Sequence, residues 1–140
     1  MMMKNRRVFN LLICCFVFLL LTKEVSAQCC NTSLYASAVA PVSGTTTIST
    51  CNFLSEYSEI SSVIVGSSYT LEVTSSNAWI TVYSGSSCGT FIADGQSPLT
   101  FSAPTSGTYF VHWTVNSSCA TATTGCETTT ITAVNTTPTQ

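Results

Sequence analysis

Alternation of apolar and polar residues with a period of two most restricts the fold of this chain. It is clearest at 69–74, 78–83 and 107–115; in the first run Tyr69, Leu71 and Val73 share one face. Shorter runs follow the same pattern at 45–50, 56–65, 90–93, 99–103 and 128–134. No window repeats with the helical period, and β-branched Thr, Val and Ile dominate. The sequence therefore predicts an all-β protein of about eight strands.

Clusters of turn residues separate these runs, as at Gly66-Ser67-Ser68 and Asp94-Gly95-Gln96. Short strands at such regular intervals predict an antiparallel β-sandwich. An immunoglobulin-like sandwich would place a core tryptophan between two spaced cysteines, and that pattern is not clear in this sequence. The prediction is therefore a jelly-roll-like sandwich, stapled by disulfides.

The first 27 residues have the order of a secretory signal peptide. Basic Lys4, Arg6 and Arg7 precede an apolar stretch at 8–21, and Val25-Ser26-Ala27 provides small residues for cleavage. A membrane anchor would need roughly 20 apolar residues. Lipidation at Cys29 is an alternative, although Gln28 stands where such signals carry Gly or Ala. We predict a signal peptide at 1–27, one domain at 28–140 with a short C-terminal tail, and a secreted or cell-surface protein without membrane insertion after cleavage.

Six cysteines remain after cleavage, and an even number in an exported chain predicts disulfides. They are Cys29, Cys30, Cys51, Cys88, Cys119 and Cys126. Six cysteines allow fifteen pairings, so the connectivity stays open. Cys119–Cys126 is the best single prediction because these two close a short loop. Cys29 and Cys30 are adjacent, so each is expected to reach elsewhere, with Cys51 and Cys88 as the remaining partners.

All four cations precede residue 24, and this excludes several functions. Binding of nucleic acid or of an acidic membrane requires Lys or Arg to neutralise phosphates. The mature chain also has few residues for a catalytic triad, because it contains one histidine, His112, and one aspartate, Asp94. His112 alternates with Val111 and Trp113 and is predicted to be an exposed sheet residue. We expect no enzymatic activity.

Two sets of residues are candidate sites. If Ala78, Ile80 and Val82 are buried, then Trp79, Thr81 and Tyr83 form an exposed strip suited to a glycan, whereas the alternative packs Trp79 into the core. Calcium is a possible cofactor, with Glu56, Glu59 and Asp94 as oxygen ligands, although no DxDxDG loop is present. Asn31, Asn116 and Asn135 begin N-glycosylation patterns that matter only in a eukaryotic secretory pathway.

Several segments together resemble a β-sandwich module of secreted Bacteroidetes proteins that is similar to bacterial pre-peptidase C-terminal domains. They include Thr45–Cys51, Glu56–Ile60, Trp79–Ser84, Cys88-Gly89 and Gly107–Tyr109. The resemblance covers most of the mature chain and implies an accessory binding or spacing role. The expected function is thus a small extracellular binding or adhesion module for a glycan or a cell-surface protein. The alternative is a structural surface protein that self-assembles through sheet edges.

Overall fold

The computed structural model describes residues 28–75 and 77–134, which contain nine β-strands and no helix. The predicted signal peptide and tail lie outside these residues. None of the described segments is a helix able to span a membrane. The strands are β1 (Ser33–Val39), β2 (Thr45–Leu54), β3 (Glu56–Val63), β4 (Ser68–Val73), β5 (Trp79–Ser84), β6 (Thr90–Gln96), β7 (Leu99–Ser102), β8 (Gly107–Thr114) and β9 (Ala122–Val134).

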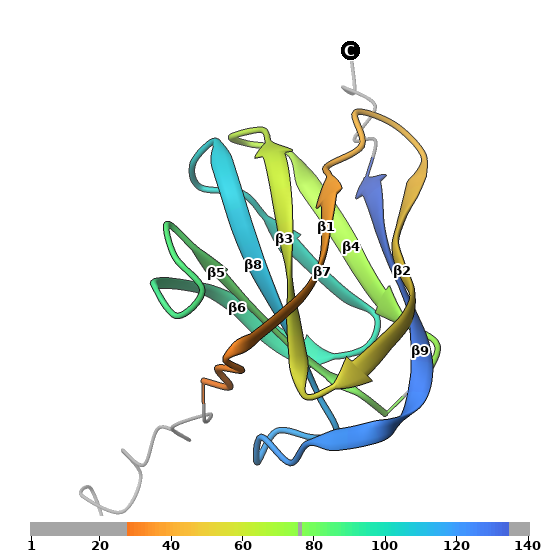
Figure 1. Cartoon of the computed structure of the whole chain (residues 1–140). Coiled ribbons are helices and arrows are strands. Elements are labelled where there is room, and N and C mark those ends of the chain that lie inside the picture. The colour runs from red at the N-terminus through yellow and green to blue at the C-terminus, as the bar shows by residue number, and fades with distance from the viewer. Residues whose placement is uncertain (1–27, 76, 135–140) are drawn as a thin grey trace, which may run out of the picture.

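Two sheets pack face to face as a sandwich (Figure 1). The five-stranded sheet has the order β1-β3-β8-β5-β6 and the four-stranded sheet the order β2-β9-β4-β7. From β2 onward the antiparallel pairs are nested, with β5–β6 innermost and then β4–β7, β3–β8 and β2–β9. This nested order is jelly-roll-like, and the predicted disulfide-stapled β-sandwich is confirmed.

Strand β1 is the element that the sequence pattern missed. It lies at the edge of the five-stranded sheet and runs parallel to β3, as the two arrows in Figure 1 show. Its Ser and Ala residues give little alternation in hydrophobicity, and its large side chains at Leu34, Tyr35 and Val39 are exposed. The described chain therefore has nine strands where about eight were predicted.

The core lies between the sheets and is made by the faces that the alternation predicted. Fully buried large side chains include Tyr69 and Leu71 from one sheet and Tyr109, Val111 and Trp113 from the other. A buried polar pair is included and satisfied, because Trp113 Nε1 donates to Ser58 Oγ at 3.1 Å.

The outer face of the four-stranded sheet is covered by hydroxyl groups. Thr45, Thr132, Thr70 and Thr100 stand in one row across its four strands. The Thr45–Thr132 and Thr70–Thr100 hydroxyls are each 2.8 Å apart, as cross-strand hydrogen bonds. This face therefore meets solvent through uncharged polar groups, except at Glu72.

Three disulfides connect the six predicted cysteines as Cys29–Cys119, Cys30–Cys88 and Cys51–Cys126. The predicted Cys119–Cys126 pair is wrong. Cys126 on β9 lies beside Cys51 on the neighbouring strand β2, with their Cα atoms 4.3 Å apart. The pairing of β2 with β9 brings Cys51 and Cys126 together although they are far apart in the sequence. Closeness in sequence, on which the Cys119–Cys126 prediction relied, did not determine the partner. Cys29 and Cys30 do reach separate partners, and Cys88 is one of them, but the expectation that Cys51 is the other is wrong, because Cys29 pairs with Cys119.

Candidate functional site

The predicted strip lies on the outer face of the five-stranded sheet. Ile80 and Val82 point into the core, so Trp79, Thr81 and Tyr83 face outward together on β5. The strip is nevertheless not open. Thr81 is 0% and Tyr83 3% exposed, and only Trp79 is partly exposed. Another part of the chain must cover this face.

The N-terminal strap, residues 28–32, and the β5–β6 loop, residues 85–89, lie over His112, the cross-strand neighbour of Thr81, because Asn31 and Ser87 both contact its ring. The Cys30–Cys88 disulfide joins the strap to that loop. The loop is tight, because Gly85 has a φ of 83° and a Cβ at Gly89 would lie only 2.5 Å from the Ser84 carbonyl oxygen. Glycine at these two positions allows the loop to turn over the sheet and present Cys88.

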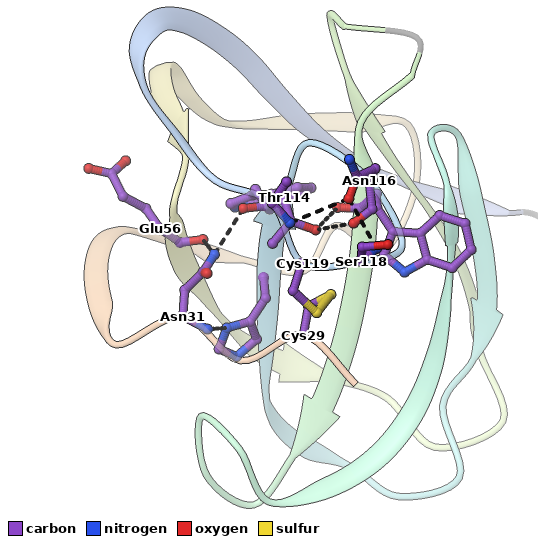
Figure 2. The surroundings of a disulfide bond; sticks show 11 residues. Cys29, Asn31, Glu56, Thr114, Asn116, Ser118 and Cys119 are labelled. Carbon is purple, nitrogen blue, oxygen red and sulfur yellow. Dashed lines mark hydrogen bonds between the residues drawn. A yellow bond between two sulfur atoms is a disulfide. The ribbon is translucent and has the colours of Figure 1, made fainter. Parts of the chain in front are cut away.

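A second disulfide, Cys29–Cys119, ties the strap to the loop after β8 (Figure 2). Asn116 shapes this loop, since its side-chain oxygen accepts from the backbone N–H of Ser118 at 3.0 Å. Its main-chain carbonyl accepts from the N–H of Cys119 at 3.0 Å, and Cys119 adopts a positive φ of 61°. The turn therefore orients Cys119 toward the strap.

Asn31 joins the strap to the strands beneath it. Its side-chain Nδ2 donates to the carbonyl oxygens of Glu56 at 2.8 Å and of Trp113 at 2.9 Å, as Figure 2 shows in part. These carbonyls belong to β3 and β8, so a single amide bridges two strands and the strap. Sequence reasoning noted Asn31 only as the start of a glycosylation pattern, and no local signal marks this long-range role.

His112 lies under the strap and is 0% exposed, so the prediction of an exposed residue is wrong. It does face away from Val111 and Trp113 as expected, but the strap buries it. Asn31 N–H donates to its Nδ1 at 2.8 Å, and its Nε2 contacts the carbonyl oxygen of Ser87. Because Nδ1 accepts, the proton of the neutral ring lies on Nε2 and is donated to Ser87. Burial lowers the pKa of His112 from 6.5 to about 4, against the opposing effect of the Ser87 carbonyl.

Within the described part of the chain, one group of side chains has the proximity needed for a metal ion. The potential ligand atoms of Cys30, Cys88 and His112 lie within 4.8 Å of one another. The two sulfurs are joined in a disulfide, and both ring nitrogens are engaged by the main chain. Thiolate is the form of cysteine that binds metals. In this oxidised state the group therefore has a structural role: it holds the strap and the β5–β6 loop over His112.

The three carboxylates considered for calcium are not brought together. Glu56 turns back to accept from the backbone N–H of Phe53 at 2.9 Å. Glu59 lies on β3 and Asp94 on β6, with β8 and β5 between them. Asp94 instead acts locally, because its charge adds to burial, the larger cause, in raising the pKa of Tyr83.

Aromatic rings form a continuous series over the covered face. Phe110 contacts Tyr57 with ring centroids 6.3 Å apart, and Tyr57 stacks on His112 at 5.1 Å. Tyr83 meets His112 at 5.2 Å and Phe91 at 6.2 Å, both edge to face. The inner rings of Tyr83 and His112 are buried, whereas Tyr57, Phe91 and Phe110 reach the surface at least in part. Sequence alternation showed the aromatic residues on β8 and β5 but not their alignment with Tyr57 and Phe91.

Comparison with known proteins shows the fold. No protein-family model matches the chain, and no curated protein matches it significantly. Among solved structures, it resembles Aeromonas hydrophila PliG, described as a periplasmic lysozyme inhibitor of g-type lysozyme. The TM-score is 0.51 with 13% identity, covering 73% of this chain and 98% of that one.

The same inhibitor from two other bacteria gives weaker alignments. A mutant from Escherichia coli has a TM-score of 0.42 with 10% identity, covering 71% of this chain and 100% of that one. The Salmonella Typhimurium protein has a TM-score of 0.42 with 13% identity, covering 71% and 99%. At these identities, the Aeromonas alignment is evidence for a shared sandwich fold.

Proposed function

We propose that this protein is an exported, non-catalytic module that binds another protein. Its three disulfides require an oxidising compartment outside the cytoplasm. The non-catalytic part of the proposal rests on the environment of His112. The single histidine of the chain is buried with both ring nitrogens bound to the main chain, so it cannot serve as a general base.

The shared fold supports the binding part. The Aeromonas protein is described as a periplasmic inhibitor of g-type lysozyme, so its target is a protein. A sandwich clamped by disulfides also suits recognition, because a rigid surface loses little conformational entropy on association. The accessory role that the pre-peptidase-like resemblance implies agrees with this proposal.

A glycan is the second ligand class for such a module. Trp79 is partly exposed, and its buried Nε1 has no hydrogen-bond partner within residues 28–75 and 77–134. The exposed part of the indole ring, and not this buried nitrogen, would be the surface on which a sugar face stacks. Binding on a glycan array that disappears in Trp79→Ala would identify this class, and binding unchanged in that variant would place any glycan elsewhere.

The test uses purified residues 28–140 in biolayer interferometry against a g-type lysozyme. The control analyte is the same lysozyme after reduction and alkylation. We expect saturable binding to the folded enzyme with a Kd of about 1 µM or tighter, and loss of lytic activity in proportion to occupancy. Equal binding to the unfolded control would show nonspecific association. Absence of saturable lysozyme binding would refute the protein-binding part of the proposal, and hydrolysis of a substrate by the protein would refute the non-catalytic part.

Self-assembly through sheet edges is a competing function with its own support. The edge strand β1 exposes Leu34, Tyr35 and Val39, and exposed apolar edges invite strand addition. Sedimentation velocity over a wide concentration range separates the two functions. Concentration-dependent polymers that disappear in Tyr35→Lys would favour assembly, whereas a monomer at all concentrations would favour the binding module.

A further inference from the structure

The two outer faces of the sandwich differ in chemistry. The outer face of the four-stranded sheet presents threonine and serine hydroxyls and carries a single carboxylate within its rows, Glu72. The outer face of the five-stranded sheet presents three partly or fully exposed aromatic rings and two partly exposed carboxylates, Glu59 and Asp94. We call this surface the aromatic face, made by Tyr57, Glu59, Phe91 and Phe110.

Buried neighbours on adjacent strands hold the rings of the aromatic face in place. Tyr57 stacks on the buried His112 with an interplanar angle of 24°, and Phe91 meets the buried Tyr83 edge to face. His112 is in turn fixed by Asn31 and Ser87, and the strap above it is tied by two disulfides. Side chains that are already ordered lose little entropy when a ligand docks on them. Partly exposed aromatic residues of this kind are typical of protein interfaces.

The charge on this face is negative. Glu59 on β3 stands directly across from Phe110 on β8, and Tyr57 lies two residues away on the same face of β3. From Glu24 to Gln140 the chain has no lysine or arginine that could pair with Glu59. A cation over an aromatic ring is attracted to its π-electrons, and a neighbouring carboxylate adds an ion pair. Glu59, Tyr57 and Phe110 therefore combine the two elements that recognise an ammonium or guanidinium group.

We propose that the aromatic face is the surface on which this module binds a basic protein, with a lysine or arginine side chain of the partner lying over Phe110 and Tyr57 and paired with Glu59. The inference rests on the proposed binding function and names the surface and the chemistry of its partner. Charge complementarity selects a basic partner, because residues 24–140 offer carboxylates and no Lys or Arg.

The opposite sheet provides a matched comparison within the same molecule. Glu72 on β4 is an exposed outward glutamate, opposite Thr130 on β9. Its side chain and charge equal those of Glu59, but its cross-strand neighbour is a hydroxyl residue instead of an aromatic ring. A general attraction between cations and an acidic protein would involve both glutamates, whereas a built site would involve Glu59 alone.

The first experiment titrates a capped tetra-arginine peptide into isotopically labelled residues 28–140 and follows amide chemical shifts. The control ligand is the matching tetra-citrulline peptide, which is uncharged and nearly isosteric. We expect shifts centred on Tyr57, Glu59 and Phe110 for the arginine peptide only. Glu59→Gln and Phe110→Ala should each weaken its binding by about fivefold, and Glu72→Gln by less than about twofold. Equal shifts around Glu72, equal binding of the citrulline peptide, or no binding would overturn the proposal.

The second experiment separates this inference from the proposed function. The same three variants are tested against the g-type lysozyme used above, with near-ultraviolet circular dichroism to verify their fold. Wild-type binding lost in Glu59→Gln and Phe110→Ala supports both. Binding unchanged in these variants leaves the binding function standing and refutes the aromatic face as the site. If tetra-arginine binds at Glu59 and no protein binds, the surface is supported and the proposed function fails.

Discussion

The buried His112 makes the stability of this protein depend on pH in a direction that can be worked out. In the folded state its Nδ1 accepts the N–H of Asn31 at 2.8 Å, so a proton on that nitrogen would face another proton. Burial lowers the pKa of the folded ring from 6.5 to about 4. As the pH falls from about 6.5 to about 4, the unfolded chain gains a proton that the folded chain does not.

The stability that the neutral ring provides is thus complete above pH 6.5 and is lost as the pH falls toward 4. A change in pKa from 6.5 to about 4 corresponds to a loss of about 3 kcal/mol in the free energy of unfolding. Within this window the slope approaches about 1.4 kcal/mol per pH unit. That is a large fraction of the total stability of a small domain, commonly about 5–15 kcal/mol.

The assay is urea unfolding followed by tryptophan fluorescence at a series of pH values between 7.5 and 4, with His112→Gln as the control. Glutamine removes the titration and keeps an amide that can bond the main chain. The variant should be less stable at pH 7.5 by about 2 kcal/mol, because the ring contacts with Tyr57 and Tyr83 are lost. As the pH falls toward 4, wild type alone loses about 3 kcal/mol, so this difference should shrink and then reverse, leaving the variant the more stable by about 1 kcal/mol. Carboxylates titrate in both proteins, so this difference isolates His112.

The reasoning would be refuted by either of two results. One is a wild-type protein whose stability changes with pH as that of His112→Gln does. The other is a native imidazole that titrates near 6.5, which is directly measurable because His112 is the only histidine in the chain.

Three further predictions concern the strap and the composition. Replacing Cys30 and Cys88 by serine should lower the free energy of unfolding by up to about 4 kcal/mol and raise the pKa of His112, whereas serine at Cys51 and Cys126 should lower stability without changing that pKa. Urea unfolding and imidazole titration by NMR measure both effects, and equal titration curves in the two variants would show that the Cys30–Cys88 disulfide does not keep His112 buried. Asn31→Ala should lower the free energy of unfolding by about 2 kcal/mol, because it removes the donor to the carbonyls of Glu56 and Trp113. Asn31→Asp also lacks this donor and should lower it at least as much in the same assay, so an Asp variant as stable as wild type would show that these bonds contribute little. Trypsin should leave urea-unfolded residues 28–140 uncut while chymotrypsin cleaves them, as mass spectrometry would show, because no Lys or Arg follows Lys23; tryptic fragments within that range would contradict this.

The strands of the sandwich were predictable from local pattern because burial of one sheet face imposes the two-residue period. Leu71, Val73, Val111 and Trp113 all lie in the core, as their alternation indicates. Strand β1 was not predictable in this way, because its larger side chains remain exposed at a sheet edge. A strand that buries few apolar side chains shows little alternation of apolar and polar residues in its sequence.

The candidate site was predictable in orientation but not in burial. Alternation placed Trp79, Thr81 and Tyr83 on the face opposite Ile80 and Val82, with the core as the alternative for Trp79, and the structure turns this face outward. Alternation also separated His112 from the core-facing Val111 and Trp113. The exposure of this face and of His112 depended on the strap, which is separated from β8 by about 80 residues, and on disulfides whose pairing the sequence left open. The short-loop preference for Cys119–Cys126 failed for a related reason, since β2 and β9 are distant in sequence and adjacent in the sheet.

The absence of lysine and arginine after residue 23 has opposite consequences for stability and for binding, and their dependence on salt distinguishes the two. Within residues 24–140 no Lys or Arg can form an ion pair, so added salt should leave the melting temperature unchanged or raise it slightly by screening repulsion between carboxylates. Association of Glu59 with a basic partner would instead weaken as salt screens the attraction and slows the encounter. Binding that persists at high salt would indicate an apolar contact, for which the exposed residues of β1 are the better surface. Measuring melting and binding over the same salt series therefore distinguishes a charge-selected partner on the aromatic face from a hydrophobic contact at the sheet edge.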